Sequence, residues 1–292
     1  MPVSMEYTTF TFRRPDTSHL DKCQRWGQVL AETDDLAGFI RYLKSDTKSI
    51  GSGVTMPFKV AVIPLLDELT EAGRAVGAIN TIFYRTGLDG QRRYVGTNTD
   101  VLGIRDAFLN NVSGASYVGK PAVVVGGGGT CRAAVYALRD LLGCSPVYIV
   151  NRDKSEVDAV INEYASRDAA QGLIHAATRA QAEFLPQPGI IVSAVPDYTP
   201  KTAKEVEARH ILEIFLQRGH AGSPLLEMCY HPSPDTAISR LAESSGWQVI
   251  GGIEAMLGQG LAQASLWTGL QIGGALRKQV SQRVKDNPSS KA

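Results

Sequence analysis

Four consecutive glycines at positions 126–129 follow a short apolar run and precede a helix-forming segment, in the order AVVVGGGGTCRAA over residues 122–134. A strand that enters a glycine turn and then a helix presents backbone N–H groups at the helix N-terminus, where the helix dipole favours an anion. Glycine also lets the backbone turn sharply and approach a pyrophosphate closely. A second apolar strand over residues 147–150 completes a βαβ unit of about thirty residues, the size of a dinucleotide-binding half-fold.

The glycine spacing departs from the strict dinucleotide fingerprint at one position. Gly126 and Gly128 fill the first two glycine positions, but the third falls on Cys131, which is small without being glycine. A plain tight turn is the alternative interpretation of such a run. Because a strand and a helix flank the loop and a second strand follows, we expect a nucleotide site here.

The residues after the second strand bear on which nucleotide binds. An acid at this point binds the ribose hydroxyls of NAD and repels the additional phosphate of NADP, whereas arginine suits bidentate phosphate binding. Arg152 comes first, Lys154 adds positive charge, and Asp153 between them acts in the opposite direction. We expect NADP as the cofactor, with NAD as the alternative; the other interpretation of Arg152 is an ordinary solvated surface charge.

Composition limits the classes of protein that this chain can belong to. The 292 residues suffice for two domains, and an apolar content of 43% supports sizeable cores. A net charge of +1 does not favour a nucleic-acid or membrane surface, and neither a signal peptide nor a bilayer-spanning stretch is evident. Cys23, Cys131, Cys144 and Cys229 lie far apart and form no CxxC pair, which is typical of free thiols and not of a metal site. We therefore expect a soluble cytoplasmic protein, monomeric or homodimeric, that binds a small molecule and no metal.

Alternating elements after residue 121 predict an α/β fold of two domains. Strands are expected over 122–125, 147–150, 189–194, 224–229 and 247–250, with helices over 133–142 and 154–166, which together favour a parallel sheet covered on both faces. This Rossmann-like, doubly wound nucleotide-binding domain spans residues 102–255. A smaller α/β substrate domain spans residues 1–101 and is completed by C-terminal helices over 256–285, and residues 286–292 form a disordered tail. Within the smaller domain we expect helices over 34–43 and 60–69, a strand over 52–55 and a hairpin of 78–84 with 93–95.

Three polar segments precede the nucleotide domain: VTMPFK (54–59), GAINT (77–81) and GTNTD (96–100). Lys59 follows a proline-stiffened turn, so its ammonium has a restricted direction. Asp100 stands at the N-terminus of a helix expected over residues 100–110, where a helix cap is the ordinary explanation of an aspartate. A solvated lysine is the corresponding alternative for Lys59.

In this order the segments resemble the shikimate dehydrogenase family. Their sequences look more like those of the fungal catabolic quinate/shikimate dehydrogenases than like those of the bacterial biosynthetic enzymes. VTMPFK, AINT and NTD resemble its lysine loop and the next two motifs, and the glycine loop with VNR resembles its nucleotide site. VSAVP (192–196), LEMCYHP (226–232) and the helix over 252–269 continue the match. Seven such segments in the same order are specific, although each alone is weak.

The resemblance implies an enzyme that oxidises shikimate or quinate reversibly to the 3-dehydro ketone with NAD(P). Lys59 and Asp100 are then the catalytic acid–base pair, since a secondary alcohol must lose its hydroxyl proton while hydride leaves the same carbon. The resemblance places Thr55, Asn80, Tyr230 and Gln259 around the substrate. It places Gly126, Gly127, Gly128, Gly129, Thr130, Cys131, Asn151, Arg152, Asp153, Val195 and Gly252 at the cofactor.

Several departures from the family pattern leave alternatives open. The serine-bearing HSxSPxxHN segment is not found, and His19 in DTSHLDK is no convincing match, so the chain is expected to be N-terminally truncated, a product of an alternative start, or a divergent form. Glu227 replaces a more frequent aspartate, and Val195 replaces a threonine. A non-catalytic quinate sensor or repressor-like relative, an inactive truncated form, and a dehydrogenase for another substrate are the competing hypotheses. Retention of both Lys59 and Asp100 argues against the sensor.

Overall fold

The computed structural model describes residues 8–13, 27–32, 34–114, 116–165 and 170–286, and every structural statement below concerns these residues. Cys23, His19 and the expected disordered tail beyond residue 286 lie outside them. The chain divides into two compact units, and each is described by itself. The first unit comprises Met1–Thr99 and Leu261–Ile272, and the second comprises Asp100–Gly260 and the residues from Gly273 onward. The domain limits given above stay a prediction.

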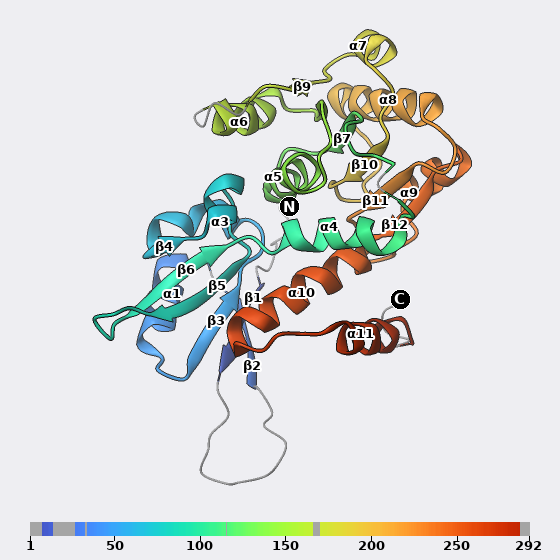
Figure 1. Cartoon of the computed structure of the whole chain (residues 1–292). Coiled ribbons are helices and arrows are strands. Elements are labelled where there is room, and N and C mark those ends of the chain that lie inside the picture. Colours follow the sequence, from blue (N-terminus) through green and yellow to red (C-terminus); the bar gives the residue numbers. More distant parts are fainter. Residues whose placement is uncertain (1–7, 14–26, 33, 115, 166–169, 287–292) are drawn as a thin grey trace. The chain divides into compact units, whose positions relative to one another are not determined.

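The first unit contains a six-stranded sheet of order β2-β1-β3-β5-β6-β4 (Figure 1). All neighbouring strands are antiparallel except β4 and β6, which are parallel. The predicted hairpin is present as β5 and β6, joined by a turn in which Gly90 adopts a φ of 75° that favours glycine. The strands are β1 (Thr8–Arg13), β2 (Gly27–Glu32), β3 (Ser49–Gly53), β4 (Glu68–Leu69), β5 (Thr81–Thr86) and β6 (Arg92–Thr97).

Helix α1 (Leu36–Ser45) covers part of this sheet and closes the core of the first unit. Asp35 caps its N-terminus, because the carboxylate oxygen Oδ1 accepts a hydrogen bond of 2.7 Å from the backbone N–H of Gly38. The buried face of α1 packs in one apolar cluster with β5 and β6, and it consists of Phe39, Ile40 and Leu43. The expected amphipathic helix over 34–43 is thereby confirmed within two residues at each end.

The prediction of a helix over residues 60–69 is wrong. The chain forms only the short turns α2 (Phe58–Ala61) and η1 (Ile63–Leu65), then strand β4, and then α3 (Glu71–Val76). Pro64 has no N–H for a helical hydrogen bond. Asp67 also bonds to β6 through its backbone and its side chain. Its N–H donates to the carbonyl of Tyr94, and its carboxylate accepts from the N–H of Tyr94 at 2.7 Å. These contacts draw the segment into the sheet.

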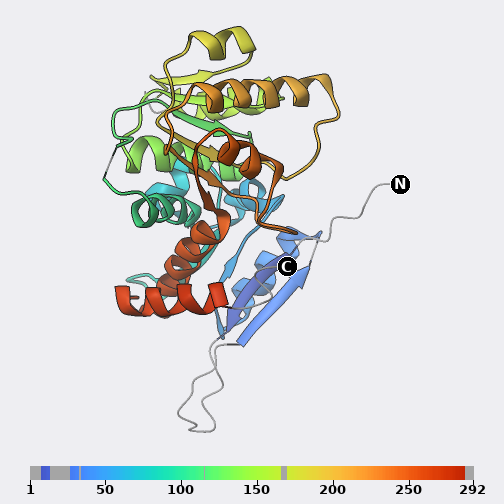
Figure 2. The same ribbon diagram turned by 90° about the vertical axis from the view of Figure 1, so that its right-hand side faces the viewer.

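The second unit contains a six-stranded sheet, parallel throughout, of order β12-β11-β10-β7-β8-β9. Figure 2 shows this unit turned by 90° from the view of Figure 1. Every residue of β7, β8, β10 and β11 is buried, as expected for a parallel sheet with both faces covered. The strand order reverses between β7 and β10, which is the switch point where doubly wound sheets bind ligands. The strands are β7 (Ala122–Val125), β8 (Val147–Val150), β9 (Leu173–His175), β10 (Ile190–Ser193), β11 (Pro224–Glu227) and β12 (Gln248–Gly251).

Helices cover the two faces of this sheet in separate groups. One apolar cluster joins the sheet to α7, α8 and α9, and its largest helical contributions are Ile211, Leu212, Phe215 and Leu216. Helix α4 contacts α5 and η2 in a second group. Among the described helices, none combines the length and apolar character that crossing a bilayer requires. The bounds are α4 (Asp100–Asn111), α5 (Gly129–Tyr136), the π-helix η2 (Ala137–Leu141), α6 (Lys154–Ala165), α7 (Arg179–Phe184), α8 (Ala203–Arg218), α9 (Ala237–Ser244), α10 (Gly252–Thr268) and α11 (Gly274–Asp286).

Candidate active site

The glycine loop follows β7 directly at the switch point of the second unit. The N–H of Gly126 donates to the carbonyl of Val150 at 2.9 Å, and its φ of 130° lies in a region that side chains rarely adopt. A Cβ atom at position 126 would lie 2.9 Å from the carbonyl oxygen of Ala194, and one at Gly127 would lie 2.3 Å from Nδ2 of Asn151. Both glycines are therefore required by the close approach of the ends of β7, β8 and β10.

Gly128 is the N-cap of α5, and it offers the geometry that a diphosphate needs. No side chain caps this end of the helix, and a Cβ atom at position 128 would meet no atom within 4 Å. The N-terminus of α5 thus has no side-chain cap and has open space beside its N-cap residue. Uncapped N–H groups at a helix N-terminus attract an anion. The residues present thus fit the pyrophosphate of a dinucleotide.

Cys131 fills the third fingerprint position as a small buried residue. Its side chain is fully buried, and burial raises the pKa of its thiol to about 12. The thiol therefore stays protonated near neutral pH and acts as a packing group. This explains how the helix tolerates cysteine where the fingerprint has glycine.

Polar side chains after β8 are engaged with one another, with one exception that bears on phosphate binding. Asn151 donates through Nδ2 to Glu156 at 2.6 Å. Asp153 accepts from both the N–H and the hydroxyl of Ser155, and these hydrogen bonds lower the pKa of its carboxyl. Lys154 pairs with Asp158 on its own helix at 2.6 Å. Arg152 instead reaches across to helix α8, where its Nη1 binds Glu205.

Val195 and Gly252 border the ends of β10 and β12. Val195 packs against the core of the second unit, and its Cγ1 lies 3.5 Å from the position of a Cβ at residue 126. A Cβ at Gly252 would lie 2.5 Å from the carbonyl oxygen of Met228, so the first turn of α10 lies against the chain that leaves β11. The sequence-predicted cofactor residues from β7, β10 and β12 are thus gathered at the carboxyl ends of their strands.

In the first unit the three polar segments are tied together by hydrogen bonds. The N–H of Ile79 donates to the carbonyl of Lys59 at 2.6 Å, which places the lysine loop beside GAINT. Asn80 is buried, and its Oδ1 accepts from the backbone N–H of Thr99 at 2.7 Å and from the hydroxyl of Thr81 at 2.7 Å. Gln263 completes this network through a 3.0 Å hydrogen bond from Nε2 to Thr81. Lys59 itself is half-buried, and Thr55 is exposed.

Asp100 begins α4 in the second unit, and Tyr230 lies within its electrostatic reach. Burial, and after it the negative charge of Asp100, raise the pKa of the Tyr230 phenol. The phenol is therefore protonated at neutral pH and can donate a hydrogen bond. The structure brings Asp100 and Tyr230 together within one unit, as it brings Lys59, Asn80 and Thr99 together in the other.

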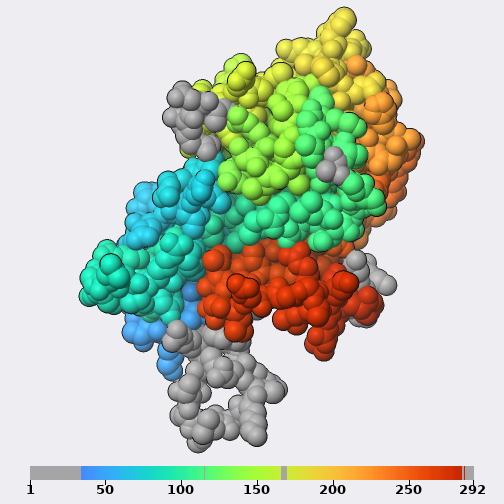
Figure 3. Space-filling view, viewed as in Figure 1, coloured from blue at the N-terminus to red at the C-terminus, as the bar shows by residue number. Residues whose placement is uncertain are grey.

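Gln259 is placed by a close contact between α4 and α10. A Cβ atom at Gly103 would lie 2.2 Å from the carbonyl oxygen of Ala255 and 3.0 Å from the backbone nitrogen of Gln259. A Cβ at Gly258 would in turn lie 2.8 Å from the Cα of Gly103. Figure 1 shows the two helices side by side, and the space-filling view shows one side of α4 at the surface (Figure 3).

Glu227 is a buried acid at the carboxyl end of β11 that the sequence singled out only as a departure from the family. Its side chain is 1% exposed. Oε1 accepts from the N–H of Cys229 at 3.0 Å and Oε2 accepts from the hydroxyl of Thr236 at 3.1 Å. Burial raises the pKa of Glu227 to about 7, although these hydrogen bonds act in the opposite direction. Glu227 therefore fixes both ends of the loop that carries Tyr230.

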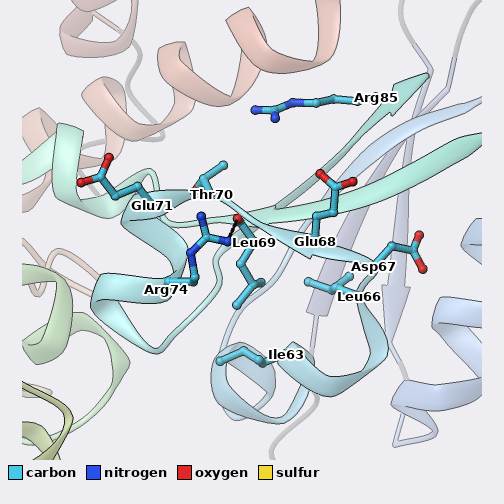
Figure 4. Close-up of a pocket in the computed structure, with 9 residues that line it drawn as sticks. All are labelled: Ile63, Leu66, Asp67, Glu68, Leu69, Thr70, Glu71, Arg74 and Arg85. Carbon is cyan, nitrogen blue, oxygen red and sulfur yellow. Dashed lines mark hydrogen bonds between the residues drawn. The ribbon is translucent and has the colours of Figure 1, made fainter. Parts of the chain in front are cut away.

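A separate pocket of about 730 Å³ lies within the first unit and includes none of the predicted site residues (Figure 4). One of its two arginines, Arg74, turns back onto its own chain and donates to the carbonyl of Leu69 at 2.5 Å. No cluster of metal-binding side chains occurs in the part of the chain that the structure describes. The pocket is lined by Ile63, Leu66, Asp67, Glu68, Leu69, Thr70, Glu71, Arg74 and Arg85.

Comparison with known proteins links this arrangement to one family. The pattern of the shikimate dehydrogenase substrate binding domain matches residues 20–82. The chain is 46% identical over 253 residues to a quinate dehydrogenase of Emericella nidulans, covering 84% of this chain and 77% of that protein. It is also 37% identical over 225 residues to the pentafunctional AROM polypeptide of Saccharomyces cerevisiae, covering 76% of this chain and 14% of that polypeptide.

Solved structures agree with the sequence relatives. The dehydroquinate dehydratase and shikimate dehydrogenase portion of AroM from S. pombe superposes with a TM-score of 0.67 at 29% identity, covering 85% of this chain and 46% of that one. Shikimate 5-dehydrogenase from Thermus thermophilus, solved with NADP(H) and shikimate, gives a TM-score of 0.62 at 25% identity, covering 85% of this chain and 83% of that one. Together with the glycine loop at the switch point, these likenesses show that the chain belongs to the shikimate dehydrogenase family of NAD(P)-dependent oxidoreductases.

Proposed function

We propose that this enzyme oxidises a ring hydroxyl of quinate or shikimate reversibly to the corresponding 3-dehydro ketone. The observation that carries the proposal is the hydrogen-bonded connection from Lys59 through Ile79 and Asn80 to Thr99, the residue directly before Asp100. Because Thr99 and Asp100 are consecutive, this connection supports a convergence of the amine and the carboxylate on one substrate alcohol. The 46% identity to a quinate dehydrogenase makes quinate the first substrate to test.

Lys59 and Asp100 supply the proton chemistry in this proposal. During oxidation the alcohol loses its O–H proton to the Lys59 amine, and two electrons leave the same carbon as hydride. The negative charge of the Asp100 carboxylate stabilises the ammonium that forms on Lys59. In the reverse direction the Lys59 ammonium returns the proton to the ketone oxygen.

The remaining predicted substrate residues orient the ring. Thr55 is exposed within the lysine loop. Asn80 joins that loop to the chain after β6, because its carbonyl accepts from the N–H of Val54 at 2.8 Å and its Oδ1 accepts from the N–H of Thr99. Tyr230 is protonated and offers a donor, and Gln259 offers both a donor and an acceptor. A polyhydroxylated carboxylate needs such mixed partners, because a buried hydroxyl without a hydrogen bond costs free energy.

The glycine loop and the end of β8 would hold NADP, with NAD as the alternative. Gly126, Gly127 and Gly128 admit the pyrophosphate to the N-terminus of α5, and Arg152 would bind the 2′-phosphate of NADP. Asn151 and Asp153 complete the strand end, and Val195 with Gly252 would border the nicotinamide. When bound, the nicotinamide ring accepts the hydride in oxidation and donates it in reduction.

Absorbance of the reduced nicotinamide tests the proposal directly. Purified protein is mixed with quinate or shikimate and with NAD or NADP, and Lys59→Ala is compared with the wild type. We expect Lys59→Ala to lower kcat by at least ~100-fold, the scale of a positioned proton-transfer group, with unchanged dinucleotide binding. Lys48→Ala, at an exposed lysine of the same unit, is the matched control and should keep full activity. An unaltered rate in Lys59→Ala would remove the acid–base assignment, and tight quinate binding without turnover in the wild type would favour a sensor.

A further inference from the structure

An ion pair between residues far apart in the sequence links the end of β8 to helix α8. Nη1 of Arg152 binds Oε1 of Glu205, across 53 residues of sequence. The Arg152 side chain is 60% exposed and that of Glu205 is 24% exposed. The guanidinium thus reaches from the nucleotide-binding edge of the sheet to a partly exposed carboxylate on α8.

The other oxygen of Glu205 is held by backbone groups. Oε2 accepts from the N–H of Lys201 and from the N–H of Thr202, each at 2.9 Å. The hydroxyl of Thr202 accepts in return from the N–H of Glu205 at 3.2 Å, which completes a capping box at the start of α8. These backbone hydrogen bonds, with a smaller contribution from Arg152, lower the pKa of Glu205 to about 2. The carboxylate is therefore ionised at any pH at which the enzyme would work.

The donors around Glu205 are the donors that a phosphate monoester uses. Phosphates bind to arginine guanidinium groups and to backbone N–H groups at helix N-termini. The Glu205 carboxylate already accepts from one guanidinium nitrogen and two such N–H groups, so an internal anion stands at this edge. Any phosphate that approached Arg152 would meet this fixed negative charge and would have to displace it or share its donors.

Resting on the proposed role of Arg152, we propose that Glu205 is a specificity-determining residue that lowers the affinity for the 2′-phosphate of NADP relative to NAD. The other charged residues at this edge determine the net charge that would remain if Glu205 were neutral. Lys204 and Arg152 are both close enough to act on the carboxyl of Asp153. Without the charge of Glu205, two cations would face one carboxylate, and a dianionic phosphate would be attracted.

Glu205→Gln is the variant that separates charge from structure. The amide oxygen of glutamine can still accept from the N–H groups of Lys201 and Thr202, so the capping box is retained, whereas the negative charge and the salt bridge to Arg152 are lost. Circular dichroism and thermal unfolding of the variant check that the fold is kept. Glu207→Gln is the matched control, because Glu207 lies on the same helix and pairs with Arg179 at 3.0 Å instead.

Isothermal titration calorimetry of wild type and variants with NADP and NAD gives the ratio of the two dissociation constants. We expect Glu205→Gln to shift this ratio about tenfold or more towards NADP, the scale of one charge-assisted hydrogen bond, and Glu207→Gln to leave it unchanged. Adenosine 2′,5′-bisphosphate and AMP, used as fragments, should show the same shift. The shift should shrink at high ionic strength, because part of it is charge repulsion near the surface.

Arg152→Ala distinguishes failure of this inference from failure of the proposed cofactor role. Selective loss of NADP binding in Arg152→Ala, together with an unchanged ratio in Glu205→Gln, would overturn the inference and leave the phosphate role of Arg152 in place. Equal loss of NADP and NAD in Arg152→Ala would remove that role itself. In the double variant the gain should be smaller than in Glu205→Gln alone, since the part that comes from releasing Arg152 is lost.

Discussion

The burial of Glu227 predicts a pH-dependent contribution to the free energy of unfolding, and the size of this contribution can be worked out from its raised pKa. The carboxyl is 1% exposed, and its pKa lies at about 7 in the folded chain instead of the ordinary 4.5. The folded state thus prefers the protonated form, so the stabilisation is fully present below pH 4.5 and is lost as the pH rises through about 7. At about 1.4 kcal/mol for each unit of pKa difference, the loss amounts to about 3 kcal/mol.

Glu227→Gln removes this titration while keeping a side chain of the same shape. The amide oxygen can accept from the N–H of Cys229, and the amide nitrogen can donate to the hydroxyl of Thr236, which rotates to accept it. The free energy of unfolding of the variant, minus that of the wild type, should therefore rise by about 3 kcal/mol between about pH 4.5 and about pH 8. All other carboxyl groups titrate in both proteins and cancel from this difference.

Urea unfolding followed by circular dichroism over this pH range measures the effect. Glu243→Gln serves as the control, because Glu243 is an exposed acid on α9. Its difference from the wild type should stay constant with pH. A Glu227→Gln difference that is equally flat would refute the reasoning, since it would mean that the buried carboxyl does not change its proton affinity on folding. The nearby carboxylate of Asp197, which raises the pKa of Glu227, makes Asp197→Asn a further check with a smaller change of the same sign.

Two further predictions concern the nucleotide loop. Gly127→Ala should lower the free energy of unfolding by about 1–3 kcal/mol, because the added methyl group would displace the Asn151–Glu156 hydrogen bond. Gly128→Ala is the control and should leave urea unfolding nearly unchanged, because its Cβ would meet nothing within 4 Å. Equal losses in the two variants would contradict the packing argument. Iodoacetamide labelling, mapped by mass spectrometry, should modify the half-buried Cys229 well before Cys131, whose pKa is raised to about 12 by burial; equal labelling rates under native conditions would mean that Cys131 is not packed as described.

Local patterns in the sequence predicted the parts of the fold that depend on neighbouring residues. The apolar run of β7, the glycines after it and the apolar run of β8 specify a strand, a turn and a second strand without help from distant contacts. The same holds for the β5–β6 hairpin and for α4, whose expected bounds over 100–110 differ by one residue from those observed. The α/β fold class follows from the alternation of such elements and is confirmed.

Elements that depend on tertiary contacts could not be predicted in this way. The sixteen-residue helix α8 was missed, because its buried residues lie only in its second half, although the Thr202–Glu205 capping box was a readable signal for its start. Strand β9 has three residues, too few to show a period. The Arg152–Glu205 pair joins positions 53 residues apart, and no spacing rule connects them. The pairing of Lys59 with Asp100 stays a prediction, tested by the variants above.

The glycine contact between α4 and α10 has a practical consequence for engineering this enzyme. Gly103 and Gly258 let two backbones touch, and the contact lies one turn from Asp100 and one residue from Gln259. A residue with a side chain at either glycine would push α4 and α10 apart, and with them the carboxylate of Asp100 and the amide of Gln259. Segments 100–106 and 255–259 should therefore be transplanted from a relative only as a set, because either one introduced alone would be fitted to a helix spacing that its new partner does not share.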